Sequence, residues 1–127
     1  MSDSYAKDLW TRAENAMKSA EVLLPVSPDD AASRAYYAVF HAVSAAFALV
    51  GRVFKKHTEV RAAVHRDWVK HGDWTVELGA DFDAVWELRD LGDYGGMRHV
   101  AADDAAATIE AARRILATLR ARYPTLG

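Results

Sequence analysis

Two residues in the first half of the chain, Arg34 and His41, have side chains that could act on a phosphodiester. They are seven residues apart, so on an α-helix they project from almost the same direction. An arginine can hold a phosphate through two charge-assisted hydrogen bonds. A histidine titrates near neutral pH and can serve as a general acid or base. As a catalytic pair they could cleave RNA without a metal, with His41 helping the 2′-hydroxyl attack and Arg34 holding the phosphate charge.

A second polar group, formed by Arg89, Asp93 and Tyr94, follows later in the sequence. Arg89 and Asp93 are four residues apart and can pair on one helix face. In a functional interpretation, these three residues bind a nucleotide or RNA across a cleft shared with Arg34 and His41. In a structural interpretation, the Arg89–Asp93 ion pair closes its helix, Arg34 pairs with a carboxylate such as Asp93, and His41 is a satisfied interior side chain. Spacing alone favours the structural interpretation, because ion pairs that only stabilise the fold are common in such arrangements.

Five helices are expected to position these residues. Apolar residues recur at three- and four-residue steps, no stretch alternates as a strand would, and prolines and glycines separate the periodic segments. Ser27 and Pro28 are typical of a helix start, Gly51 of a helix end, and Gly92 with the glycines after Tyr94 of a break. The expected helices are Ser4–Leu24, Ser27–Val50, His57–Lys70, Asp81–Leu91 and Asp103–Arg122.

The helix that carries Arg34 and His41 is apolar on almost every side. One side should face the core through Tyr36, Phe40, Val43, Phe47 and Val50. The opposite side places alanines around Arg34 and His41, which leaves a shallow groove that another helix or a ligand can approach closely. A homodimer interface along this alanine stripe (Ala31, Ala38, Ala45 and Ala48) is one explanation of the pattern.

Length and composition indicate one globular all-α domain, residues 1–127, folded as an up-and-down bundle of four to five helices. The absence of cysteine excludes a disulfide scaffold, a thiolate nucleophile and cysteine-ligated metals. No histidine spacing matches a metal motif, so we expect neither metal nor cofactor. The polar start is not a secretory signal and no apolar run is long enough for a membrane span, so we expect a cytoplasmic protein.

Two further features have a structural and a functional interpretation. The net charge of -2 gives no bulk signal for nucleic acid, but the segment Arg52–His57 is a small basic patch beside an aromatic ring. It could contact phosphates, although a solvated loop is the commoner outcome. Of the four tryptophans, Trp74 lies near a turn and is the one we expect to be exposed and available for stacking on a base.

Three segments resemble one branch of the HEPN family, the branch associated with small nucleotidyltransferases. Ser33–His41 is similar to its signature helix, Lys56–His65 to its third-helix segment, and Leu88–Tyr94 to its arginine-to-aspartate-tyrosine segment. The resemblance covers most of the chain. It implies a bundle of four to five helices, often dimeric, and frequent pairing with a nucleotidyltransferase in toxin–antitoxin-like pairs.

The resemblance has a further implication for activity. Many members of the HEPN family are metal-independent RNases that use an arginine and a histidine separated by four to six residues. Arg34 and His41 satisfy that spacing, which implies a toxin-like RNase. In those RNases, however, the motif lies near the start of the final long helix. The segment of this chain nearer that place begins at Arg89 and contains no histidine, and His99 is too distant. The alternative is therefore a non-catalytic HEPN module that dimerises and binds a nucleotide, RNA or a nucleotidyltransferase.

Overall fold

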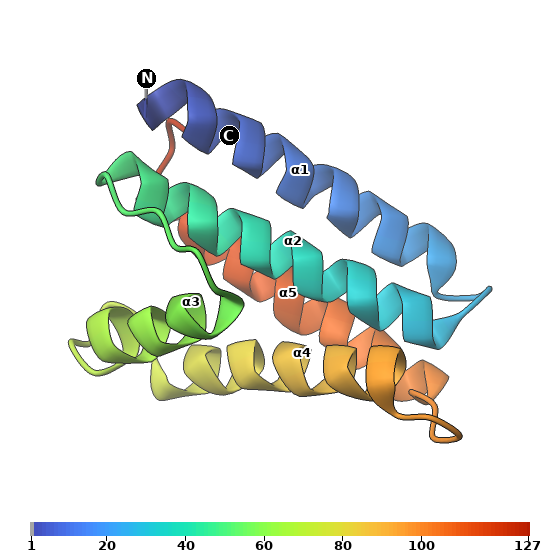
Figure 1. Ribbon diagram of the computed structural model, residues 1–127. Coiled ribbons are helices and arrows are strands. Elements are labelled where there is room, and N and C mark those ends of the chain that lie inside the picture. The colour runs from blue at the N-terminus through green and yellow to red at the C-terminus, as the bar shows by residue number, and fades with distance from the viewer. Residues whose placement is uncertain (1) are drawn as a thin grey trace.

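The protein is a bundle of helices, seen in a computed structural model that describes residues 2–127 (Figure 1). Five α-helices and one π-helical segment account for the regular structure of that range, which contains no strand. Their bounds are α1 Ser2–Leu23, α2 Pro28–Leu49, α3 His57–Ala63, η1 Val64–Val69, α4 Val76–Tyr94 and α5 Ala102–Arg122. The all-α class is thus confirmed. None of the helices in this range is long and apolar enough to span a bilayer.

Helix α2 lies at the centre of the bundle and packs against α1, α4 and α5. Its two ends form as the sequence predicts. The Ser27 hydroxyl accepts a hydrogen bond from the backbone N–H of Asp30 at 3.3 Å, and Pro28 opens the helix. At the other end Gly51 takes a φ of 79° and closes the last turn, because only glycine enters this left-handed region without strain.

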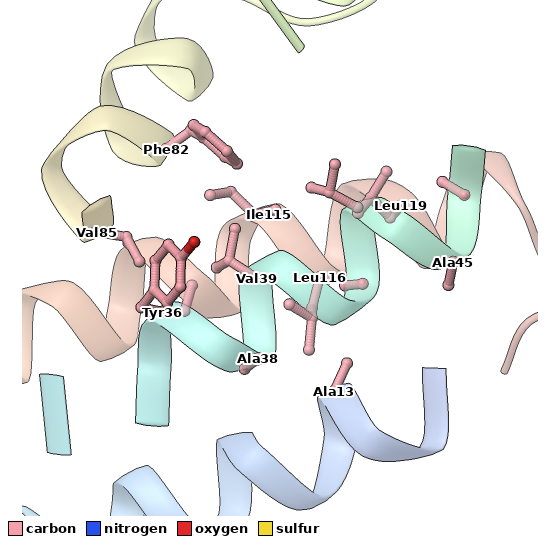
Figure 2. Close-up of a cluster of buried hydrophobic side chains, with 14 of the residues drawn as sticks. Ala13, Tyr36, Ala38, Val39, Ala45, Phe82, Val85, Ile115, Leu116 and Leu119 are labelled. Atoms are coloured by element: carbon pink, nitrogen blue, oxygen red, sulfur yellow. The ribbon is translucent and has the colours of Figure 1, made fainter. Parts of the chain in front are cut away.

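The core extends on both sides of α2, and the part that α2 forms with α4 and α5 holds most of its large side chains (Figure 2). Tyr36 and Val39 of α2 meet Phe82 and Val85 of α4 there, and Ile115 of α5 packs with them. All five side chains are buried. The expected apolar stripes of the other helices are buried too, apart from half-buried Leu24, which lies just beyond α1. On α2, however, Phe40 is only half-buried and Val50 is 64% exposed, so the expected core side of that helix holds at Tyr36, Val43 and Phe47.

The alanine stripe of α2 is covered within the chain by α1. Ala38 and Ala45 are fully buried, and in Figure 2 they point to the side of α2 where Ala13 of α1 lies. Small side chains on both helices let the two backbones approach closely. The predicted homodimer interface along this stripe is therefore wrong, because the surface is already used inside the bundle.

Helix α4 begins earlier and ends later than the sequence predicts. The Thr75 hydroxyl accepts a hydrogen bond from the Leu78 backbone N–H at 3.0 Å, so this threonine starts the helix five residues before Asp81. Gly92 does not break the helix but lies inside it, where its missing side chain allows α4 to approach the backbone of Asp29. As a result Asp93 and Tyr94 are helical and keep a fixed direction relative to Arg89.

Trp74 is buried, with 3% of its surface exposed, which corrects the expectation of an exposed stacking ring. Its ring centroid lies 5.0 Å from that of Trp68 and 6.4 Å from that of Phe82. The turn that carries Trp74 folds back on the core, so proximity to a turn did not imply exposure here.

Candidate phosphate-binding site

The two polar groups predicted from the sequence meet around the ring of Tyr37. The guanidinium carbon of Arg34 lies 4.9 Å from the centre of this ring, and that of Arg89 lies 5.9 Å from it. The ring centroid of His41 is 6.0 Å away. Tyr37 is half-buried on α2. Arg34 and His41 lie on the same side of that helix, and Arg89 comes from α4. We call Arg34, Tyr37, His41 and Arg89 the Tyr37 cluster.

Arg34 is exposed and is not ion-paired with any carboxylate in residues 2–127. The structural interpretation, in which Arg34 pairs with Asp93, is therefore wrong; Asp93 pairs with Arg89 instead. Arg34 lies over Tyr37 in a cation–π contact, which orients the guanidinium without neutralising its charge. Its hydrogen-bond donors are thus available to an external acceptor.

Arg34 and His41 line one pocket between α1 and α2, and α1 contributes a second arginine, Arg12. The remaining polar side chains of the lining are Asn15 and Ser19, and no carboxylate belongs to it. Arg12 forms a salt bridge with Asp8 at 3.2 Å, but both side chains are more than 60% exposed, so the pair is weak and open to exchange. We call this the basic pocket. Its chemistry suits an anion.

His41 is half-buried beside this pocket, and its Nδ1 atom is buried with no hydrogen-bond partner in the described part of the chain. Burial lowers the pKa of His41, and the positive charges of Arg12 and Arg34 lower it further. The lowered pKa favours the neutral form of the ring, which can accept a proton. No carboxylate holds it, unlike the histidine of a serine-protease triad, so its orientation depends on packing against Tyr37 and Phe40.

Arg89 occupies the inner side of the Tyr37 cluster and is largely buried, with 13% of its side chain exposed. Its Nε lies 3.2 Å from a carboxylate oxygen of Asp93, an ion-pair distance, although the N–H does not point at the oxygen. The guanidinium also lies 4.6 Å from the centre of the Tyr36 ring. The predicted Arg89–Asp93 ion pair is thus confirmed, and Arg89 has its charge matched within α4.

Tyr94 follows on the surface end of α4, where 72% of its area is exposed. The guanidinium carbon of Arg89 is 5.5 Å from its ring centre. The structure therefore brings Arg34, His41 and Arg89 into one cluster through Tyr37, with Asp93 and Tyr94 attached to it only through Arg89. Asp93 serves the ion pair, and Tyr94 lies at the outer edge.

Two residues of this region were not among the predicted site residues, Tyr37 itself and His57 at the start of α3. The Tyr36 hydroxyl lies 2.7 Å from Nδ1 of His57, and the His57 ring stacks on Phe40 with a 4.0 Å centroid separation. Burial raises the pKa of Tyr36, and burial together with the charge of Arg89 lowers that of His57. No local pattern marks His57, because its contacts with Tyr36 and Phe40 depend on the tertiary packing of the start of α3 against α2.

No three histidine, aspartate or glutamate side chains gather closely enough to hold a metal ion anywhere in residues 2–127. The charge available for binding a ligand at the Tyr37 cluster is thus that of Arg34, joined by His41 when its ring is protonated, because the charge of Arg89 is matched by Asp93. This arrangement can hold a phosphate, place a neutral imidazole beside it, and offer aromatic rings at its edge.

Comparison with known proteins places this geometry in a family. A solved structure from Thermus thermophilus, TT1696, superposes with a TM-score of 0.75 over 92% of this chain and 97% of its own, at 16% identity, which supports the fold alone. A UPF0332 protein of Thermotoga maritima is 39% identical over 90 residues, covering 69% of this chain and 68% of that protein. A UPF0332 protein of Gloeobacter violaceus is 29% identical over 87% of this chain and 89% of its own length. The HEPN domain matches residues 6–122, and the chain therefore belongs to the HEPN family.

Proposed function

We propose that this HEPN protein binds RNA through its phosphates, with Arg34 as the main phosphate contact. The observation that carries the proposal is the unmatched guanidinium of Arg34 in a pocket that also holds Arg12 and His41 and has no carboxylate in its lining. A phosphate placed there meets two guanidinium groups and no competing carboxylate in the lining. Contacts of this kind give binding that depends on charge and salt and not on sequence.

The inner part of the Tyr37 cluster supports this contact without making it. Arg89, neutralised by Asp93, holds the inner face of Tyr37, and Tyr37 in turn orients Arg34. Exposed Tyr94 is the one member of the second predicted group that we propose to touch the RNA directly, by stacking on a base at the rim. Arg89 and Asp93 then act as positioning residues.

The test is binding of a fluorescent single-stranded RNA to the wild type, to Arg34→Ala and to a charge-matched control. Arg114→Ala serves as the control, because Arg114 is an exposed arginine whose partner, Asp81, lies on α4 away from the basic pocket. Loss of one charge-assisted contact should weaken binding by about tenfold and reduce the salt slope by about one. Arg114→Ala should leave the affinity within about twofold of the wild type. Equal affinity of Arg34→Ala and the wild type would contradict the proposal.

Metal-independent RNA cleavage is the second candidate, favoured by the neutral His41 ring beside Arg34. In this reaction the 2′-oxygen attacks the adjacent phosphorus, His41 takes the 2′-hydroxyl proton, and the bond from phosphorus to the 5′-oxygen breaks. The departing 5′-oxygen takes a proton from water, which leaves a 2′,3′-cyclic phosphate and a 5′-hydroxyl. Arg34 stabilises the added charge on the phosphate. The toxin-like role of some HEPN proteins would need this activity.

Cleavage is tested on the same RNA with EDTA present, comparing the wild type with His41→Ala after circular dichroism shows that both are folded. Retained binding with lost cleavage in His41→Ala supports catalysis by this histidine. A wild type that binds RNA through Arg34 and does not cleave it supports the binding module instead.

Assembly remains part of the proposal. HEPN domains commonly dimerise, and the resemblance of three segments to the nucleotidyltransferase-associated branch implies a partner of that class. Because the alanine stripe is covered by α1, a homodimer of this chain would have to use another surface. Light scattering of the chain alone, and after mixing with a nucleotidyltransferase from a neighbouring gene, tests both expectations.

A further inference from the structure

A second pocket continues along the α1–α2 seam from the basic pocket, and His41 lines both. The two helices run antiparallel, so the basic pocket takes Arg12 to Ser19 of α1 while the second pocket takes Tyr5 and Leu9. The loop after α2 closes the second pocket through Arg52, Val53 and Phe54. His41 therefore lies between the basic pocket, which suits a phosphate, and the second pocket, whose lining is different.

The second pocket contains three aromatic rings besides His41, with Leu9 and Val53 completing its apolar lining, and we call it the aromatic pocket. Tyr5, Phe40 and Phe54 supply the rings, and Ser44 and Arg52 supply hydrogen-bonding groups. Arg52 is held in place by Asp67 at 2.7 Å and lies over Phe54 at 5.4 Å, so its position is fixed without a ligand. Flat faces with a few oriented polar groups are the features that proteins use to hold a nucleobase.

The size of the pocket limits what it can take. Its volume is about 130 Å³. An engineered protein cavity of about 150 Å³ binds benzene, so a single six-membered ring is near the upper limit. We expect the ring of a pyrimidine base to fill this space, whereas a two-ring purine exceeds it unless the loop 52–54 moves.

We propose that the aromatic pocket receives a pyrimidine base of the RNA strand whose phosphate lies on Arg34. The inference rests on the phosphate-binding function proposed above and specifies its substrate as single-stranded RNA. A base can enter the pocket only after leaving its stack, which is easy in a single strand and costly in a duplex. The adjacency of the two pockets at His41 places base and phosphate on one nucleotide or on neighbouring ones.

The test compares three short oligonucleotides with equal numbers of phosphates: oligouridylate, oligoadenylate and an abasic ribose-phosphate strand. Stacking of one base in the pocket should make the wild type bind oligouridylate about tenfold more tightly than the abasic strand. Oligoadenylate should bind more weakly than oligouridylate, because its bases exceed the pocket. A duplex of the same length should show no base-dependent gain.

Two variants remove the pocket without touching Arg34 or Arg12. Ser44→Met fills the space, with Ser44→Ala as its matched control; Tyr5→Ala removes a ring from a half-exposed helical position, with Tyr5→Phe as its control. Ser44→Met and Tyr5→Ala should each lose most of the preference for oligouridylate over the abasic strand. Both should keep the wild-type affinity for the abasic strand, which measures phosphate binding alone. Circular dichroism confirms that each variant is folded.

The outcomes separate this inference from the proposed function. Arg34-dependent binding that is equally strong for oligouridylate and the abasic strand would overturn the base pocket and leave phosphate binding intact. Binding of adenine at least as tightly as uracil would overturn the assignment of a pyrimidine. Absence of binding to every strand would overturn both proposals. Loss of the base preference in Ser44→Met and in Tyr5→Ala, and its survival in both controls, supports the inference.

Discussion

Replacing Gly92 by alanine tests the close approach that holds the end of α4 against α2. A Cβ atom added to Gly92 would lie 2.9 Å from the carbonyl oxygen of Asp29 and 3.3 Å from its Cα. Both are backbone atoms, so relief requires one of the helices to move. Alanine gains about 1 kcal/mol over glycine in helix propensity. Overpacking typically costs roughly 1–3 kcal/mol, and the upper half of that range, roughly 2–3 kcal/mol, applies because neither backbone atom can rotate away. Subtracting the helix gain leaves a net loss of about 1–2 kcal/mol of unfolding free energy.

Gly79→Ala is the matched control, because Gly79 lies in the same helix and its added Cβ also has a neighbour at 2.9 Å. That neighbour is a methyl group of half-buried Val69, which a small side-chain shift can displace. We expect Gly79→Ala to range from neutral to about 1 kcal/mol more stable, following helix propensity. The two substitutions are chemically identical, and the difference between them isolates backbone from side-chain contact.

Urea unfolding followed by circular dichroism measures both variants, with stability read from the midpoint at constant slope. Because the end of α4 carries Arg89, Asp93 and Tyr94, Gly92→Ala should also weaken RNA binding in parallel with its loss of stability. A Gly92→Ala protein as stable as the wild type, or more so, would refute the reasoning. It would mean that α2 and α4 can separate at this point without loss.

Three further predictions concern the same elements. Asp29→Ala should lower the free energy of unfolding by about 1–3 kcal/mol in chemical unfolding, because the backbone N–H of buried Val100 donates to this carboxylate at 2.7 Å and would lose its partner. Asp29→Asn keeps an acceptor oxygen and should recover part of that stability. Ala38→Trp should prevent folding of the monomer, since the methyl group is fully buried against α1, and an Ala38→Trp protein with the circular dichroism and cooperative urea unfolding of the wild type would contradict this packing. Burial, Arg12, Arg34 and His57 lower the pKa of His41, so below about pH 6.5 the unfolded chain takes up a proton at this residue before the folded protein does. The free energy of unfolding should therefore fall as the pH drops below that value. His41→Gln should reduce this pH dependence in unfolding measured at several pH values.

The helices and most of the core follow from local information in the sequence. Apolar residues at helical spacing predicted the buried faces of α1, α3, α4 and α5, and Ser27 and Gly51 marked the ends of α2. These features depend on neighbours within a turn or two, so a linear pattern can carry them. The helix break predicted at Gly92 was wrong, because the position of this glycine is set by a distant contact. Its role depends on the backbone of Asp29, more than sixty residues earlier, and local propensity alone predicts a break.

The candidate site divides in the same way. Spacing on one helix was sufficient to place Arg34 and His41 together, and spacing on another was sufficient for the Arg89–Asp93 ion pair. Only the tertiary structure decided that Arg34 has no carboxylate partner, and that α1 supplies Arg12 while covering the alanine stripe. Ion pairing and burial depend on which helix packs beside α2, and several packings satisfy the same apolar pattern. The sequence by itself therefore determined which residues could do chemistry, and the packing of α1 and α4 on α2 decided which of them remain free to do it.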